Sequence, residues 1–297
     1  MTPSDTQAND RVAFWDHAVA VKGHTGYADR LRHDYDQVLR LRTVAGVLDR
    51  VWPQGLTGRN ALDIGCGVGD FVALLRSRGA AVTAIDISPE VIAAARRRFA
   101  GAHDVTWLVG TIGAADLPAD TFDVITSITV LQHVVDNEEF IKSLVLLRRC
   151  LRPQGRLIVL ELAPPRASHV DVTDADGFVY LRERPPAEWE AAFARAGLRV
   201  VETPVFPQLG IALLRGLSVV VTRLTSRRRA GTGAGGTAAP AAPAMAAPPS
   251  LKRRAWDHAR RALLLLARPF DHWAGLPLPA EQHRHYRCYV LSPATTE

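Results

Sequence analysis

Short apolar runs alternate with amphipathic segments between Asn60 and Glu202. Most of these runs are rich in β-branched residues and nearly continuous, as expected for strands that are buried on both faces of a parallel sheet. Strands are predicted at Asn60–Ile64, Ala81–Asp86, Val105–Val109, Phe122–Ile128, Arg156–Glu161, Leu198–Thr203 and His285–Leu291. The alternation of strands and helices predicts an α/β fold with a doubly wound, mostly parallel sheet.

Capping residues set the expected helix boundaries. Ser88 offers an N-cap hydroxyl and Pro89 fits a first turn, so a helix is predicted to begin there and to run to Phe99. The other start and stop signals predict helices at Arg30–Val51, from Asp136 through Leu151 to a stop at Pro153 and Gly155, and at Glu188–Ala196 before Gly197.

Composition divides the chain into parts. Residues 1–12 are polar and are expected to be disordered, and residues 13–58 to form an N-terminal helical lid. The sheet domain is assigned to residues 59–207 and 282–297, with a helical insertion at 208–281 before the last strand. Within this insertion, residues 231–250 are mostly Gly, Ala and Pro and predict a flexible linker. Leu251–Arg268 has apolar residues at helical spacing and predicts a cationic amphipathic helix.

The net positive charge is concentrated in the insertion. The chain has a formal net charge of +6 and a sequence pI of about 9.6, which first suggests nucleic-acid binding. Residues 223–272, however, contain ten of the 36 Lys and Arg residues and only two of the 30 Asp and Glu residues. The remainder has 26 basic and 28 acidic residues, a net charge of −2. The charge distribution therefore argues against nucleic acid as a partner of the sheet domain.

The cysteines and the apolar segments suggest neither a metal site nor a membrane span. Cys66, Cys150 and Cys288 are far apart and lack the spacing of metal ligands, so no metal site or disulfide framework is expected. The polar start shows no secretory signal, which indicates a cytoplasmic protein. The longest apolar stretch, Leu209–Val221, is interrupted by Arg215 and is too short to span a bilayer.

A glycine-rich loop follows the first predicted strand. Gly65, Gly67 and Gly69 alternate with other residues, which permits a tight turn and a close approach of a ligand to the backbone. This GxGxG spacing differs from the GxGxxG of dinucleotide-binding loops, and the carboxylate of Asp63 beside it suits a ligand that carries an amino group. Asp86 ends the second strand, where a carboxylate can accept hydrogen bonds from two ribose hydroxyls. These features together predict a nucleoside-binding site.

The chain resembles the class I S-adenosylmethionine-dependent methyltransferases, in particular their small-molecule, type 11-like branch. The resemblance rests on four motifs in the family's order: LDIGCGVGD, AIDIS, DLPADTFDVITSITVLQHV and LRPQGRLIVLE. It covers roughly Ala61–Glu202. It implies a Rossmann-like, seven-stranded sheet whose last strand, here His285–Leu291, is antiparallel, and S-adenosyl-L-methionine as the cofactor.

The resemblance also implies roles for individual residues. Residues expected at the methionine moiety of the cofactor are Asp63, Gly65, Cys66 and Gly67. Asp86 is expected at the ribose, Ile87 against the adenine, and Ser127 on the sulfonium side.

One position departs from the family pattern. Many members place an Asp after the third strand to bind the adenine amino group, whereas this chain has Gly110, Thr111 and Ile112. The Thr111 hydroxyl and the Ile112 backbone are expected to take part instead, without a carboxylate contact.

His133 and Glu161 are the candidate catalytic residues. Methyl transfer from a sulfonium is an in-line displacement, so the protein must align the reacting atoms and, for some acceptors, take a proton. His133 follows the fourth strand and suits the role of base, with packing or capping of the next turn as the alternative. Glu161 ends the fifth strand and is placed to orient an amine or hydroxyl, with a solvated strand-end carboxylate as the alternative.

The favoured function is methyl transfer to an O or N atom of a small-molecule acceptor, such as a secondary metabolite, a sugar or a lipophilic compound. A membrane-associated methyltransferase of a lipid or quinone-like substrate is an alternative, because the basic insertion with Trp256 also resembles an interfacial helix; a helical lid explains the same pattern. A non-catalytic cofactor-binding protein stays open because of Thr111. A nucleic-acid methyltransferase is disfavoured by the near-neutral sheet domain, and an NAD-dependent enzyme by the GxGxG loop.

Overall fold

The computed structural model describes residues 3–25, 30–113, 115–164, 171–173, 179–206, 258–259, 262–266 and 286–294. The chain separates into two compact units, Met1–Phe206 with Pro279–Glu297, and Pro207–Leu278. In the second unit, the described residues 258–259 and 262–266 are helical and lie within the predicted amphipathic helix. The apolar stretch Leu209–Val221 and the predicted linker 231–250 lie outside the described residues.

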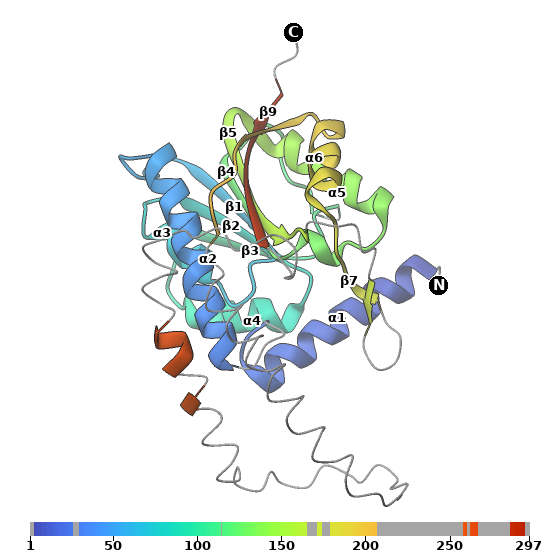
Figure 1. The fold of residues 1–297 in the computed structure, drawn as a ribbon. Helices are drawn as coiled ribbons and strands as arrows, with labels where there is room; N and C mark the ends of the chain where they lie inside the picture. The colour runs from blue at the N-terminus through green and yellow to red at the C-terminus, as the bar shows by residue number, and fades with distance from the viewer. Residues whose placement is uncertain are drawn as a thin grey trace, which may run out of the picture. The chain divides into compact units, whose positions relative to one another are not determined.

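A seven-stranded sheet forms the centre of the first unit (Figure 1), in the order β3-β2-β1-β4-β5-β9-β8. Its strands are β1 (Asn60–Ile64), β2 (Ala81–Asp86), β3 (Val105–Val109), β4 (Phe122–Ile128), β5 (Leu151–Leu162), β8 (Leu198–Glu202) and β9 (Tyr286–Pro293). Neighbours from β3 to β5 pair in parallel, whereas β9 pairs antiparallel with both β5 and β8. The predicted Rossmann-like sheet with an antiparallel last strand is confirmed.

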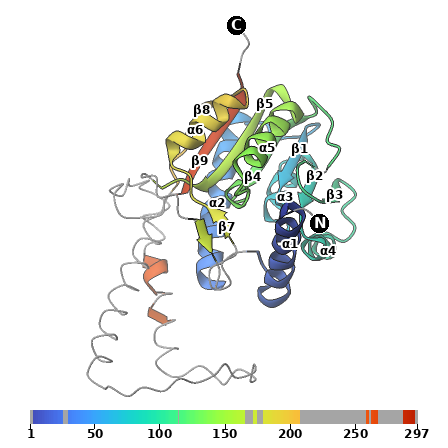
Figure 2. The same cartoon turned by 90° about the vertical axis from the view of Figure 1, so that its right-hand side faces the viewer.

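Helices cover both faces of this sheet (Figure 1 and Figure 2). One face packs against α2 (Arg30–Val51), α3 (Asp70–Arg76) and α4 (Pro89–Arg98), and the other against α5 (Asn137–Cys150) and α6 (Pro186–Arg195). Alternate residues of β4 divide between the two cores, since Val124 packs toward α2 and α3 while Ile125 packs toward α5. The near-continuous apolar strands in the sequence therefore reflect burial on both sides.

The predicted caps form as expected. Ser88 Oγ accepts a hydrogen bond from the Val91 backbone N–H at 3.0 Å, and Asp136 Oδ1 accepts one from the Glu139 N–H at 2.8 Å. Gly197, with φ of 72°, follows the end of α6 as predicted. Helix α5, however, ends at Cys150, and Leu151, Pro153 and Gly155 belong to β5. Leu151 is fully buried and pairs with Phe122, so its apolar side chain serves the strand and not the helix.

The N-terminal region also differs from the prediction. Residues 1–12 were expected to be disordered, but helix α1 extends over Pro3–Lys22. Polar composition reduces the surface a segment can bury but does not prevent it from forming a helix that is anchored further along. Two residues of α1 anchor the helix. Arg11 pairs with Glu139 at 3.4 Å, and Asp16 Oδ1 accepts a hydrogen bond from Ser88 Oγ.

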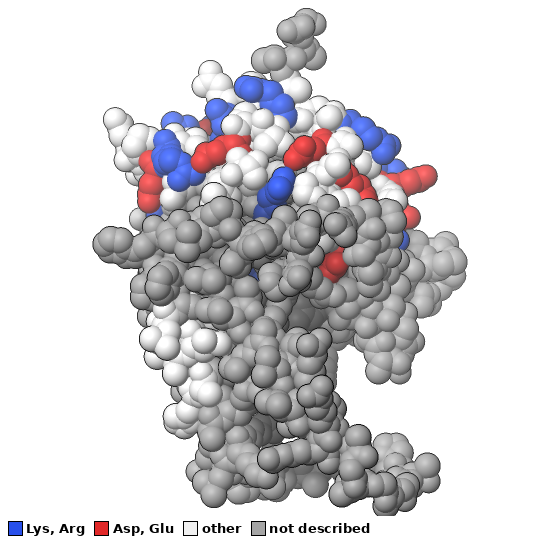
Figure 3. All heavy atoms as spheres, in the orientation of Figure 1, with Lys and Arg blue, Asp and Glu red and all other residues white. Residues whose placement is uncertain are grey.

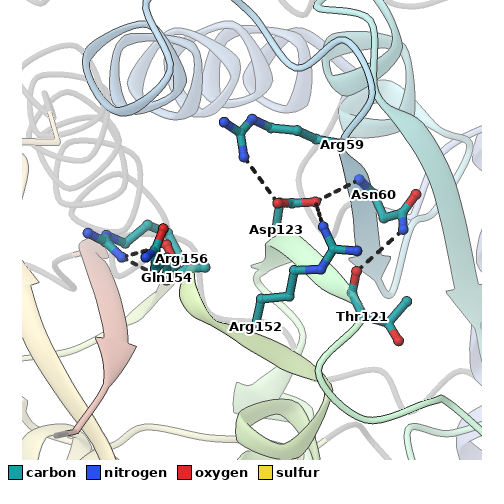
Figure 4. A network of polar contacts seen from close by, with 8 residues as sticks. Arg59, Asn60, Thr121, Asp123, Arg152, Gln154 and Arg156 are labelled. Carbon is teal, nitrogen blue, oxygen red and sulfur yellow. Dashed lines mark hydrogen bonds and ion pairs between the residues drawn. The ribbon is translucent and has the colours of Figure 1, made fainter.

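An ion-pair network binds the amino-terminal ends of β1 and β4 (Figure 4). Asp123 accepts hydrogen bonds from Arg59 at 3.1 Å, from Arg152 at 2.9 Å and from the Asn60 backbone N–H at 3.0 Å. These contacts fix the edge of the sheet opposite to the one where parallel strands carry ligands.

The described surface carries mixed charge. On the face shown in Figure 3, Lys and Arg side chains lie among Asp and Glu side chains over the described residues. Helices long and apolar enough to cross a membrane are absent from the parts of the chain that the structure describes. The mixed charge agrees with the near-neutral composition of the sheet domain.

Candidate functional site

The candidate residues gather at the carboxyl-terminal edge of the parallel strands. The loop 65–69 follows β1, Asp86 ends β2 and is followed by Ile87, and Thr111 and Ile112 follow β3. Ser127 lies near the end of β4, and β5 ends with Glu161 and Leu162. Ligands of open α/β sheets bind in the crevice outside this edge. The fold thus brings the predicted site residues, which lie at the ends of five different strands or just after them, to one edge of the sheet.

The glycines of the loop have little room for side chains. Gly65 and Gly67 have φ values of 61° and 54°. A Cβ atom on Gly65 would lie 2.4 Å from Val130 Cγ2, and one on Gly67 would lie 3.0 Å from Thr25 Oγ1. The loop is therefore pressed between the segment after β4 and the end of the N-terminal helical region, which explains glycine at both positions by sterics as well as by φ.

Asp63 and Ser127 are buried polar residues with incompletely satisfied hydrogen bonding. The Asp63 side chain is 1% exposed, and its Oδ1 accepts a hydrogen bond from Thr126 Oγ1 at 2.6 Å. Asp63 Oδ2 and Ser127 Oγ make no hydrogen bond with any described group. Burial raises the pKa of Asp63 to about 7. An unpartnered buried carboxyl oxygen is costly unless a ligand group completes it.

Asp86 joins the glycine loop to the start of α4. Its Oδ2 accepts a hydrogen bond from the Gly67 N–H at 3.0 Å, and its Oδ1 accepts one from the Ser88 N–H at 3.1 Å. Burial raises the pKa of Asp86 above its usual value, although the hydrogen bonds from these backbone N–H groups act in the opposite direction. Each carboxylate oxygen has a second lone pair, so Asp86 can orient the loop and still accept a ligand hydroxyl.

The segment after β3 lies beside Asp86. The Gly110 N–H donates to the Asp86 backbone oxygen at 2.9 Å, and the next residue, Thr111, is partly buried. Ile112 is 7% exposed and packs into the core with α5, so its side chain serves the fold. Ile87 is partly exposed and Cys66 is buried, with its Sγ 3.6 Å from the Gly67 oxygen.

The turn after β4 holds His133 on a short 3-10 helix, η1 (Leu131–His133). His133 is partly buried, and its Nε2 lies 3.2 Å from Gln132 Nε2. Gln132 is 2% exposed, and its Oε1 accepts a hydrogen bond from the Leu162 N–H at 3.2 Å. The sequence interpretation missed Gln132, although its position next to the nominated histidine was a signal.

Glu161 is buried and is held by the backbone of the turn after β4. The residue is fully buried, and its Oε1 accepts hydrogen bonds from the Val130 and Leu131 N–H groups at 2.9 and 2.8 Å, with Oε2 3.4 Å from the Gln132 nitrogen. Burial raises its pKa to about 8. Glu161 therefore holds the turn that carries His133, which contradicts the alternative of a solvated strand-end carboxylate. Its location at the strand end alone could not show that it points inward.

Helix α1 contributes residues that the sequence did not nominate. Trp15 packs edge-on against the His133 ring with centroids 5.2 Å apart, and Asp16 accepts the Ser88 hydroxyl. Arg11 Nη1 lies 3.5 Å from the His133 carbonyl oxygen. Helix α1 thus contacts both the α4 side and the η1 side of the edge. Tyr35 of α2 is partly buried against the core.

In the described part of the chain, His, Cys, Asp and Glu side chains form no group of three or more suited to a metal ion. The polar groups at this edge are carboxylates, hydroxyls and backbone N–H groups around a glycine loop. Such a set fits an organic ligand with amino and hydroxyl groups.

We expect Gly65→Ala to disturb the turn of His133 as well as the loop. The added methyl group would overlap the side chain of Val130, which precedes η1. The backbone of the new alanine would also have to adopt a positive φ. A loss of about 2 to 3 kcal/mol in the free energy of unfolding is expected for combined overlap and strain, measured by urea titration.

The double variant Gly65→Ala with Val130→Ala separates these causes. Removing the Val130 methyl groups relieves the overlap but leaves the positive φ, so part of the loss should be recovered. If the double variant loses as much stability as the two single variants together, direct packing of Gly65 on Val130 is contradicted.

Residues 62–159 match a family model described as a methyltransferase domain. Demethylmenaquinone methyltransferase from Tropheryma whipplei (strain Twist) is 37% identical over 109 residues, which cover 37% of this chain and 44% of that protein. The mitochondrial ubiquinone biosynthesis O-methyltransferase of Schizosaccharomyces pombe is 36% identical over 108 residues, which cover 35% of this chain and 38% of that protein. The chain spans less than half the length of these curated relatives.

A solved structure of similar fold is that of Burkholderia thailandensis 1,6-didemethyltoxoflavin-N1-methyltransferase with bound 1,6-didemethyltoxoflavin and S-adenosylhomocysteine. The TM-score is 0.55 at 19% sequence identity, and the match covers 70% of this chain and 85% of that one. Together with the strand order, the family model identifies the core of the molecule. Residues 62–159 therefore match the methyltransferase domain family, and the sheet that contains them has the fold of a class I S-adenosylmethionine-dependent methyltransferase.

Proposed function

We propose that the protein transfers the methyl group of S-adenosyl-L-methionine to an O or N atom of a small-molecule acceptor. The observation that carries this proposal is the unpartnered Oδ2 of Asp63, buried beside the glycine loop and next to the strand that ends with Asp86. A glycine-rich loop, a carboxyl group short of one donor and an acceptor for hydroxyls fit the amino acid and ribose parts of this cofactor.

The remaining nominated residues complete the fit. Asp63 would hold the amino group, with Gly65, Cys66 and Gly67 along the methionine moiety, and Asp86 would accept from the ribose. Ile87, Thr111 and Ile112 would border the adenine, and Ser127, whose hydroxyl lacks a described partner, would lie toward the sulfonium. When bound, the cofactor supplies an electrophilic methyl group.

The chain's own residues would then align the acceptor and exclude water. Displacement at a methyl group requires that the nucleophile, methyl carbon and sulfur lie in line, so positioning supplies most of the acceleration. His133 and Trp15 lie at the end of β4 beside the nucleoside site, where an acceptor would be held. Glu161 acts indirectly, by holding the turn of His133.

A lipophilic, quinone-like acceptor is the second candidate. Both curated relatives are named for quinone biosynthesis or for demethylmenaquinone. A peripheral membrane contact through the basic insertion would suit such an acceptor, because cationic amphipathic helices bind anionic lipid surfaces. Sedimentation of the full chain with anionic but not neutral vesicles would support this version, and its absence with both would overturn it.

Ligand stabilisation and methyl transfer test the main proposal. S-adenosylhomocysteine at 100 times its Kd should stabilise the fold by about 2.7 kcal/mol, whereas NADH should not. Transfer of labelled methyl is then expected to at least one member of a panel of phenols, quinols, amines and sugars. Stabilisation by NADH alone would overturn the cofactor assignment. Cofactor binding without transfer to any acceptor would favour a non-catalytic protein.

A further inference from the structure

Gln132 connects the backbone of β5 to the ring of His133. Its Oε1 accepts a hydrogen bond from the Leu162 N–H at 3.2 Å, and its Nε2 lies 3.2 Å from His133 Nε2. The Gln132 backbone N–H points to Glu161 Oε2 at 3.4 Å, and its side chain is 2% exposed. Backbone and side chain of Gln132 are thus both held by the end of β5.

These contacts determine which nitrogen of His133 carries the proton. The Leu162 N–H is a donor only, so the amide of Gln132 must present its oxygen there and its NH₂ group to His133. An amide NH₂ group cannot accept a hydrogen bond, so His133 Nε2 must be the unprotonated nitrogen that accepts one from it. In a neutral imidazole the proton then resides on Nδ1.

We propose that Gln132 is a positioning residue that holds His133 as the neutral Nδ1–H tautomer. The role of His133 in methyl transfer rests on the proposed function, but the tautomer itself does not. In this state the Nε2 lone pair is occupied by Gln132, so His133 accepts a proton there only if that hydrogen bond breaks. In this state the ring therefore does not act as a general base through Nε2.

The charged groups around the ring come from four elements. Arg11 on α1 contacts the His133 carbonyl oxygen and pairs with Glu139 on α5. Glu161 on β5 accepts the N–H groups of the turn, and Arg184, before α6, donates to the Val134 carbonyl oxygen at 2.9 Å. Arg11 and Arg184 are positive and Glu139 is negative, whereas Glu161, with its pKa raised to about 8, is mostly protonated near pH 7.5. Of the groups around the ring, Gln132 is the one whose NH₂ group contacts Nε2.

Nitrogen-15 NMR of the imidazole rings of the full chain tests the proposal without any cofactor. The signal of His133 is assigned by its loss in His133→Gln. In the wild-type protein near pH 7.5, Nε2 should show the chemical shift of an unprotonated ring nitrogen and Nδ1 that of an N–H. A protonated Nε2 in the wild-type protein would overturn the proposal, whatever the variants do.

Gln132→Met removes the amide while keeping the length of the side chain. Nε2 protonation should become populated, and the midpoint of the His133 titration should rise by about one pH unit, since a donor that opposes ring protonation is lost. Gln154→Met, at the opposite edge of the sheet, makes the same chemical change and should leave the His133 signals in place. Equal spectra of Gln132→Met and the wild type would refute the assignment.

The pH profile of kcat separates this proposal from the proposed function. If methyl transfer occurs, Gln132→Met should shift the His133-dependent limb of the profile upward by the same amount as the NMR midpoint. If no acceptor is methylated, the proposed function fails while the NMR result still decides the tautomer. A profile that does not move while the NMR midpoint does would remove His133 from the reaction and leave the tautomer assignment intact.

Discussion

Replacing Glu161 with alanine is expected to lower the free energy of unfolding by about 4 kcal/mol. The change leaves the N–H groups of Val130, Leu131 and Gln132 without their acceptor inside a fully buried site. Each unsatisfied buried donor costs about 1 to 3 kcal/mol, and water can reach the site only by opening the turn. Chemical denaturation at 25 °C measures the loss.

Glu161→Gln separates the loss of hydrogen bonds from the loss of buried side-chain volume, because glutamine keeps the size of the side chain. A glutamine oxygen at the position of Oε1 still accepts from Val130 and Leu131, and only the longer contact to Gln132 meets an NH₂ group. A loss of about 1 to 2 kcal/mol is therefore expected. Glu202→Ala, which removes a carboxylate exposed at the surface, should change stability by less than about 1 kcal/mol. Equal losses for Glu161→Ala and Glu202→Ala would contradict the proposed anchoring.

The buried carboxyl group also gives stability a pH dependence. The folded pKa of Glu161 is about 8, above the ordinary value of 4.5, so the folded protein keeps a proton that the unfolded chain releases. Its contribution is complete below about pH 4.5 and is lost as pH rises through about 8. The decline of stability over this interval should be smaller in Glu161→Gln, which does not titrate.

The sheet was predictable because each strand is a dense apolar run. The bounds of Asn60–Ile64, Ala81–Asp86, Val105–Val109 and Phe122–Ile128 are confirmed without change. The start of β5 was missed, because Leu151 has the same apolar side chain whether it ends a helix or begins a strand. Pairing with Phe122 decides the matter, and that is a tertiary contact.

The site was predictable to the level of the strand ends but not of the side-chain directions. Glycines and carboxylates at alternate positions of one loop identify Asp63, Gly65, Gly67 and Asp86, since their local chemistry is unusual. No local signal shows that Glu161 points into the interior, or that a polar N-terminal segment forms a helix against His133. Both depend on groups distant in sequence, such as the N–H groups of the η1 turn and the ring of Trp15.

Binding of S-adenosylhomocysteine should depend on the ionisation of Asp63. The pKa of Asp63 in the folded protein is about 7, and the ammonium group of the ligand pairs only with the ionised form. Below that pH, binding must release a proton from Asp63, so the Kd should rise about tenfold for each pH unit. Above the pKa of Asp63 the carboxylate is ionised, so affinity should level off there for as long as the amino group of the ligand stays protonated.

Adenosine and Asp63→Asn provide the matched controls for calorimetric titration. Adenosine lacks the amino acid part, so its Kd should not show the tenfold rise per pH unit that Asp63 causes. In Asp63→Asn, S-adenosylhomocysteine should bind about 100-fold more weakly near pH 7.5, because a charge-assisted contact is worth about 1.5 to 3 kcal/mol, and the acid-side dependence should vanish. If adenosine and S-adenosylhomocysteine lose affinity in parallel at low pH, then the titrating group lies at the ribose side, and the assignment of Asp63 to the amino group is wrong.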